Sequence, residues 1–394
     1  GPFDSGTAAV EARGLTQDQY REIVASRPPW DIAGGMLWKS LASVEDDPAL
    51  AAASPGALAG AVRVPIHIMH AYQDEQTGPS GVWLWNAVPD DTPKRLVLSN
   101  GDHGVVGNFN SDRRGWLDFW TLRDGKEDSR GLADRDRRVQ VHFETRRDAR
   151  SVNKPLTAAD FPLPRTVWTR YYFREQGKLA VARPEEAALP GDSYQVDASR
   201  PDSERVGATY QLEFAAPTAV CGPLAVTLWA SCSTVDTDFF VVVADVDPRG
   251  VVQALQRGLL RASHRALDRE TSHWVTLDGE ETLVRPRHTH RAVQPLTPGV
   301  PHEFHIEVFP VGHVFRPGHR LLLRVSPPPR ADRVTRHGDG RPAYEYESAP
   351  PPGSVTILRD REHPSSVLVP LLPELPPIAD PPPKPGEQDG IFVE

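Results

Sequence analysis

Two short apolar runs constrain the fold of this chain more than any other feature of its sequence. The first run covers residues 64–72 and is followed by Asp74, and the second covers residues 94–98 and leads into His103. Both are rich in aliphatic side chains and are bounded by proline or polar residues, which is typical of buried parallel strands. The residues between them, 79–88, fit a helix. We therefore expect a strand–helix–strand unit of a parallel sheet.

An acid and a histidine each follow one of these predicted strands, where the reactive groups of open α/β sheets gather. Asp74 and His103 lie 29 residues apart. An acid followed by a histidine is the order of the last two members of an α/β-hydrolase triad. Asp74 would then orient the imidazole of His103, which accepts the serine proton and returns it to the leaving group. From these forty residues alone, a turn-capping Asp and a surface His remain the commoner interpretation.

The nucleophile of such a triad is missing from the sequence. No serine lies in a Gly-x-Ser-x-Gly motif, and two parallel strands are too few for a stable sheet. We expect the serine on about 100–200 further residues, supplied by an N-terminal part of the same gene product or by a separate chain. Because loss of a triad nucleophile costs on the order of 10⁶ in rate, this chain alone should be nearly inactive.

Changes in sequence pattern divide the chain into four parts. Residues 1–60 are predicted to be helical, as part of a cap over an active site or as an ordinary pair of packing helices. Residues 61–135 hold the parallel strands with Asp74 and His103. Residues 136–372, from the run that starts at Val139, contain many short alternating strands with almost no helical pattern, which predicts a sandwich or jelly roll. Residues 373–394 form a Pro-rich acidic tail.

Composition excludes several functional classes. The net charge of −9 and the lack of a Lys/Arg block argue against nucleic-acid binding, and no apolar run is long enough to span a membrane. The two cysteines, Cys221 and Cys232, are expected to be reduced, which favours the cytoplasm over secretion. Gly1 and Pro2 are typical of the remnant of a cleaved tag, so the native N-terminus and the compartment stay open. The Trp-rich N-terminal segment also leaves an oligomer open.

Several motifs together resemble the C-terminal part of the cocaine esterase / X-Pro dipeptidyl-peptidase family of serine hydrolases, which includes the α-amino-acid ester hydrolases. They span most of residues 60–370, and their combination is highly specific. The matching stretches are residues 64–74, 100–104, 221–229, 236–248, 258–262, 313–321 and 362–366.

The resemblance implies a partial α/β-hydrolase domain, made of its last strands and a cap segment, followed by a jelly-roll β-sandwich. It also implies that Asp74 is the triad acid and His103 the triad base. The serine of the family and its oxyanion-hole tyrosine have no counterpart in this sequence. No cofactor and no metal are implied.

Other candidate ligands are interpreted as structural. His302 and His305 are one residue short of the zinc-protease spacing and would face opposite sides of a strand. His288 and His290 would share one strand face, but no third ligand is evident. Structural roles are also expected for Asp236, Asp238, Asp245, Asp247, His313 and His319.

Three functions remain open. The first is a serine hydrolase that cleaves a small-molecule ester or amide through an acyl-enzyme. The second is an acyltransferase that uses the same triad but excludes water, so that an amine or alcohol takes the acyl group. The third is a noncatalytic jelly-roll module that binds carbohydrate or protein. The paired acid and histidine argue against the third, and acceptor-dependent product formation would separate the first two.

Overall fold

The computed structural model shows two compact units, residues 1–57 and 58–394. The described residues are 54–74, 77–101, 110–122, 128, 131–144, 155–197, 199–200, 206–328 and 351–376. The predicted cap segment lies almost wholly outside these ranges, as do His103 and most of the Pro-rich tail.

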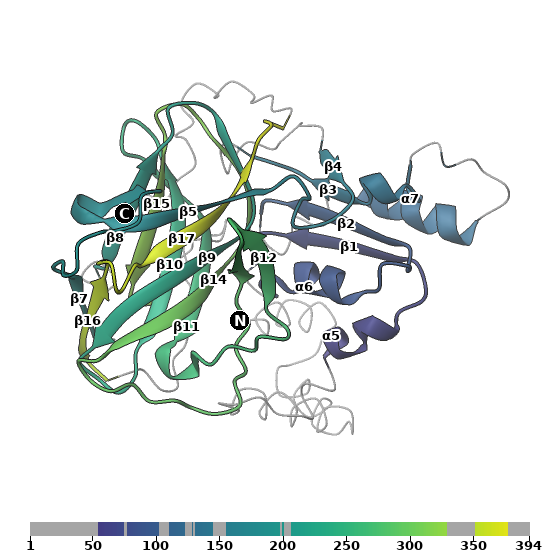
Figure 1. Cartoon of the computed structure of the whole chain (residues 1–394). Coiled ribbons are helices and arrows are strands. Elements are labelled where there is room, and N and C mark those ends of the chain that lie inside the picture. The colour runs from purple at the N-terminus through teal and green to yellow at the C-terminus, as the bar shows by residue number, and fades with distance from the viewer. Residues whose placement is uncertain are drawn as a thin grey trace, which may run out of the picture. The chain divides into compact units, whose positions relative to one another are not determined.

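The predicted strand–helix–strand unit is confirmed (Figure 1). Strands β1 (Ile66–Ala71) and β2 (Lys94–Ser99) run parallel. Their first residues are paired with each other, and so are their last residues. Helix α6 (Ser80–Ala87) connects them. Because the C-terminal ends of the two parallel strands lie side by side, the residues that directly follow them are brought close together.

Two further short strands complete a four-stranded sheet in the order β1-β2-β3-β4. Helix α7 (Asn110–Thr121) leads toward β3 (Val139–Val141), which is parallel to β2, and β4 (Leu156–Ala158) is antiparallel to β3. The sequence pattern assigned the run from Val139 to the sandwich, and that placement is wrong. Val139 and Val141 are both fully buried, and an alternating strand of three residues carries no information about which sheet accepts it.

The two helices cover opposite faces of this sheet. Alternate residues of β2 point to opposite sides, so Lys94 faces α6 and Arg95 faces α7. The Lys94 ammonium lies 4.5 Å from the ring centre of the fully buried Trp85 on α6. The Arg95 guanidinium donates to the carboxylate of Asp112 on α7 at 2.9 and 3.1 Å. The sheet is therefore covered on both faces, as a parallel sheet requires.

The second part of the fold is a large β structure, in agreement with the predicted all-β C-terminal part. Its strand order is β14-β11-β10-β15-β8-β6-β5-β17-β9-β16-β7, and β9 also pairs with β14, so the ladder closes on itself. A separate hairpin is formed by β12 and β13. The bounds are β5 Val167–Arg174, β6 Lys178–Ala180, β7 Asp192–Val196, β8 Ala208–Glu213, β9 Thr218–Cys232, β10 Asp238–Val246, β11 Val252–Arg261, β12 His273–Leu277, β13 Glu280–Arg285, β14 Pro301–Phe315, β15 Arg320–Ser326, β16 Gly353–Leu358 and β17 Ser366–Leu372.

Short helical turns join these elements. They are α5 Pro55–Leu58, η1 Ala59–Ala61, η3 Arg135–Arg137, η4 Glu175–Gly177 and η6 Ala262–His264.

Two hydrophobic cores meet along strands β9 and β14. The larger core fills the β structure and includes aromatic pairs such as Phe239 and Phe304, whose ring centres are 4.7 Å apart. The smaller core lies on the α6 face of the parallel sheet around Trp85, and it also contains Cys221 of β9 and Val314 of β14. The parallel sheet is thus packed against the β structure through shared apolar surface.

Both cysteines lie on β9 and form no disulfide. Cys221 and Cys232 are eleven positions apart on one extended strand, roughly 35 Å, which is far beyond bonding distance. Burial raises the pKa of both thiols to about 12. Within the described part of the chain, no helix is long and apolar enough to cross a membrane.

Candidate active site

Asp74 lies just beyond the C-terminal end of β1, in a turn that is closed by its own side chain. The carboxylate Oδ1 accepts the backbone N–H of Thr77 at 2.8 Å, and the N–H of Asp74 donates to the carbonyl of Ala71 at 3.2 Å. Only 3% of Asp74 is exposed. The hydrogen bond from the backbone N–H of Thr77 holds the carboxylate in place.

The segment after β2 runs alongside this turn. The N–H of Tyr72 donates to the carbonyl of Ser99 at 2.8 Å, and the N–H of Gln73 donates to the carbonyl of Gly101 at 3.1 Å. The ladder between β1 and β2 therefore continues past the strand ends. His103, two residues after Gly101 in the sequence, lies outside the described residues.

A buried amide joins the two strand ends. Gln73 is fully buried, and its Nε2 donates to Asn100 Oδ1 at 3.0 Å and to the carbonyl of Leu255 at 2.8 Å. Its Oε1 accepts the N–H of Gly101 at 2.7 Å. Because Leu255 belongs to β11, this one side chain links the ends of β1 and β2 to the β structure.

Two more amides extend this link. Asn100 Nδ2 donates to the carbonyl of Gly312 on β14 at 2.7 Å. Gln256 on β11 is fully buried, and its Nε2 donates to the carbonyls of Tyr72 at 2.6 Å and Pro310 at 2.8 Å. The backbone just before Asp74 is thus held by a side chain from a distant part of the sequence.

A buried arginine adds positive charge next to the acid. Arg257 is 3% exposed; its guanidinium lies 3.5 Å from the carbonyl oxygen of Asp74 and 5.7 Å from the ring centre of Phe309. Sequence reasoning missed Gln256 and Arg257. The available signal was a polar pair in the middle of a strand, between Leu255 and Gly258.

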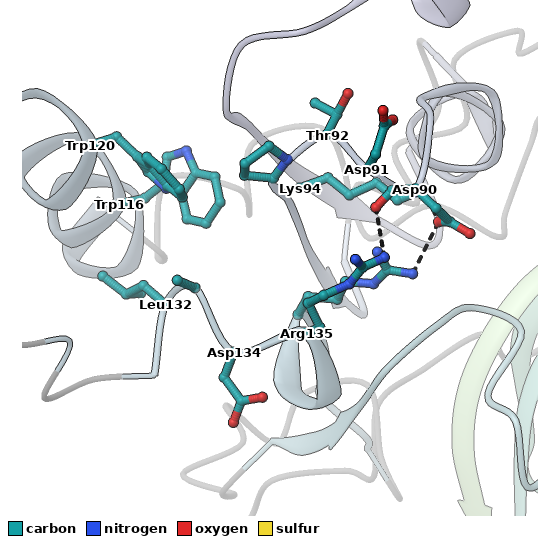
Figure 2. A pocket seen from close by; sticks show the side chains of 12 residues that line it. Asp90, Asp91, Thr92, Lys94, Trp116, Trp120, Leu132, Asp134 and Arg135 are labelled. Atoms are coloured by element: carbon teal, nitrogen blue, oxygen red, sulfur yellow. Dashed lines mark hydrogen bonds and ion pairs between the residues drawn. The ribbon is translucent and has the colours of Figure 1, made fainter.

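A pocket of about 160 Å³ lies near the N-terminal end of β2 (Figure 2). Trp116 and Trp120 of α7 form one side of it, and residues 90–94, which lead into β2, form the other. Asp74 lies at the opposite ends of the strands. Since reactive groups of parallel sheets collect at the C-terminal strand ends, the position of this pocket does not fit an active site.

The histidine candidates are dispersed. On β14, His302 Nε2 accepts the N–H of Thr297 at 3.3 Å, while His305 Nδ1 lies 3.5 Å from Thr227 Oγ1. The ring centres of His288 and His290 are 6.1 Å apart, and the Nδ1 atoms of His290 and His264 are 3.2 Å apart. Among the described residues, no group of three or more His, Cys, Asp or Glu is arranged to hold a metal ion.

Two of the aspartates cap turns, as expected. Asp236 accepts the N–H groups of Thr237 and Ser263, each at 2.9 Å. Asp247 accepts the N–H of Val251 at 2.9 Å. Both carboxylates therefore satisfy backbone donors at the ends of strands.

The other two aspartates pair with basic side chains inside the β structure. Asp238 accepts two hydrogen bonds from Arg261 at 2.8 and 2.9 Å. The carboxylate of Asp245 lies 2.9 Å from His313 Nε2 and 2.9 Å from His319 Nδ1. Burial raises the pKa of Asp245, but these hydrogen bonds outweigh it and hold the pKa below its usual range. These contacts agree with the structural roles expected for all four residues.

Comparison with known proteins identifies the family. A family model described as the X-Pro dipeptidyl-peptidase C-terminal non-catalytic domain matches residues 133–368, more than half of the chain. Cocaine esterase from Rhodococcus sp. is 25% identical over 352 residues, which cover 79% of this chain and 57% of that protein.

Solved structures show the same fold. A CocE/NonD family hydrolase from Staphylococcus aureus superposes with a TM-score of 0.65 at 19% identity, over 80% of this chain and 55% of that one. An α-amino acid ester hydrolase gives a TM-score of 0.63 at 17% identity, over 87% of this chain and 62% of that one. The chain thus spans little more than half the length of these relatives. It belongs to the cocaine esterase / X-Pro dipeptidyl-peptidase family of hydrolases and matches the C-terminal portion of its members.

Proposed function

We propose that this chain supplies the acid and the base of a serine-hydrolase triad, Asp74 and His103, to an enzyme whose nucleophile lies on a polypeptide outside this sequence. The parallel sheet would then be the last part of an α/β-hydrolase domain, preceded by a cap segment in residues 1–60 and followed by a jelly roll. The proposed substrate is a small-molecule ester or amide, as the names of the related esterases suggest.

The observation that carries this proposal is the joining of the two strand ends. Gln73 and Gly101 exchange two hydrogen bonds, at 3.1 and 2.7 Å. They immediately precede Asp74 and the segment that contains His103. An acid in this turn and a histidine two residues after Gly101 in the sequence, following neighbouring parallel strands, support the proposed triad.

The chemistry follows from the roles of the two groups. A serine hydroxyl attacks the substrate carbonyl while His103 accepts its proton, and the same proton then passes to the departing alcohol or amine. Water attacks the acyl-enzyme in the second half of the reaction, again with His103 as base. Asp74 fixes the ring of His103 and stabilises its protonated form. The nucleophile and oxyanion donors would come from the polypeptide outside this sequence.

A fluorophosphonate probe tests where the nucleophile lies. The purified sample is labelled and separated on a denaturing gel, and its intact mass is measured by mass spectrometry. A label on a second polypeptide, or on a longer form of this chain, supports the proposal. A label within the 43.4 kDa sequence itself would show that the nucleophile belongs to these residues and that the proposed division is wrong.

Substitution of the acid tests the role of Asp74 in the complete protein. We expect Asp74→Asn to lower kcat by about 10⁴-fold, because the amide stabilises the wrong tautomer of the histidine. Asp118→Asn, on the exposed side of α7, is the matched control and should leave kcat unchanged. Unchanged turnover in Asp74→Asn or in His103→Ala would contradict the proposal.

A noncatalytic binding module is the second candidate, because the matching family model is described as non-catalytic. That match begins at residue 133, after both Asp74 and His103. The description therefore covers the β structure together with β3 and β4, and leaves β1, β2 and Asp74 outside it. Retention of full turnover without His103 would favour the binding module.

A further inference from the structure

We propose that three amide side chains, Gln73, Asn100 and Gln256, are positioning residues that fix the ends of β1 and β2, which lead to Asp74 and to His103, against the β structure. We call these three side chains the amide clamp. This inference rests on the proposed function, since it concerns how Asp74 and His103 are held. It assigns to the β structure a part in setting the geometry of the triad.

The clamp connects four separate elements. Gln73 follows β1 and Asn100 follows β2, and their amides bond to each other at 3.0 Å. Gln73 also donates to the carbonyl of Leu255 on β11 at 2.8 Å, and Asn100 donates to the carbonyl of Gly312 on β14 at 2.7 Å. Gln256 on β11 reaches back in the opposite direction. The connection is therefore made from both sides.

The clamp acts on the backbone that flanks the reacting groups. Gln256 holds the carbonyl of Tyr72, two residues before Asp74, at 2.6 Å. Gln73 holds the N–H of Gly101, two residues before His103, at 2.7 Å. A movement of the end of β1 or of β2 relative to its partners would break these hydrogen bonds directly.

Burial of these amides favours a single position of the strand ends relative to the β structure. Gln73 and Gln256 are fully buried, and a buried amide is costly unless its donors and acceptors are paired. Every partner described above is present only when the ends of β1 and β2 lie against β11 and β14. Apolar side chains would pack equally well in several positions, whereas hydrogen bonds depend on distance and angle. Catalysis demands such accuracy, because misplacement by about 1 Å costs on the order of 10²-fold in rate.

The test uses this chain alone and observes the hydrogen bond between Asp74 and His103 by proton NMR. A histidine Nδ1–H bonded to a carboxylate gives a resonance far downfield. We expect this resonance in the parent chain, and its loss in Asp74→Asn identifies its origin. Gln256→Leu removes two clamp bonds and should abolish or broaden the resonance.

The chain offers a matched control on the same strand. Gln253 is three residues from Gln256 on β11 and is 9% exposed, and its amide nitrogen has no hydrogen-bond partner among the described residues. Gln253→Leu is thus the same chemical change without the clamp and should keep the resonance. If Gln256→Leu does not fold, as judged by cooperative thermal unfolding, Asn100→Ala replaces it, because Asn100 is only half-buried.

The outcomes separate the two proposals. A parent chain without the resonance, or one that keeps it in Asp74→Asn, overturns the proposed acid–histidine pair and the clamp with it. A resonance that is lost in Asp74→Asn but persists in the folded clamp variant overturns the clamp alone. In the complete protein, we expect Gln256→Leu to lower kcat by about 10²-fold with KM unchanged. A change in KM alone would contradict a positioning role.

Discussion

At the scale of single residues, Asp112 anchors helix α7 to the parallel sheet. Its carboxylate lies 2.7 Å from His67 Nε2 and accepts two hydrogen bonds from Arg95 at 2.9 and 3.1 Å. Partial burial raises the pKa of Asp112, but the hydrogen bonds from His67 and Arg95 and the charge of Arg95 lower it to well below its usual range. The carboxylate is therefore ionised at neutral pH, and it compensates the charge of Arg95.

Removal of this carboxylate should destabilise the chain. Asp112→Ala leaves the guanidinium of Arg95, which is 2% exposed, without its charge partner, so we expect the free energy of unfolding to fall by about 3 kcal/mol. Urea unfolding followed by circular dichroism measures the change. Asp118→Ala on the exposed side of the same helix is the control. Equal stability of the two variants would show that the ion pair contributes nothing.

At the scale of elements, strands β11 and β14 approach so closely that one position requires glycine. Gly258 is paired with Val308, and a Cβ atom at Gly258 would overlap the carbonyl oxygen of Glu307. This contact is with backbone, which cannot rotate away as a side chain can. The same two strands carry Gln256 and the carbonyls that accept hydrogen bonds from Gln73 and Asn100, so their approach determines the position of the clamp.

Gly258→Ala should therefore be costly. We expect a loss of about 1–3 kcal/mol in the free energy of unfolding, because the strands must separate or bend to accept the methyl group. Gly60→Ala is the control, since no atom lies within 4 Å of its Cβ position. The two variants are compared by thermal and urea unfolding. A Gly258→Ala protein as stable as Gly60→Ala would refute the close approach.

At the scale of the whole molecule, three half-buried histidines make the fold sensitive to acid. Burial lowers the pKa of His142, His288 and His305 to about 4 each, with smaller contributions from neighbouring charges. In the unfolded chain, histidines titrate near 6.5. Between these two values the unfolded state binds more protons than the folded state, so stability falls as the pH falls from about 6.5 to about 4. Below that window these histidines are protonated equally in both states, so their contribution to the loss levels off.

The acid sensitivity can be measured as the melting temperature against pH. Each histidine should contribute a slope of about 1.4 kcal/mol per pH unit to the free energy of unfolding within the window. His305→Gln, which cannot be protonated, should reduce the slope by about one third. An unchanged slope in this variant would mean that His305 is protonated to the same extent in the folded and unfolded states.

Local patterns in the sequence determined a large part of this structure. The apolar runs before Asp74 and after residue 93 form β1 and β2 in the predicted parallel arrangement, and the helix predicted over residues 79–88 is α6. Alternating short runs gave most strands of the β structure. These features depend on the period of hydrophobic residues along a few positions, which a sequence displays directly.

Long-range pairing was decided only by the tertiary structure. Nothing local to Val139 indicates that β3 joins the parallel sheet, and nothing local to Gln256 indicates that its amide meets the carbonyl of Tyr72, 184 residues away. A short strand has the same alternation in any sheet, and a buried amide has the same composition whatever its partner. The sequence by itself thus determined which segments are strands and helices and the order of acid and histidine. Packing of distant strands decided which sheet each segment joins and which side chains hold the Asp74 loop, because those contacts depend on hydrogen-bond partners that no local window contains.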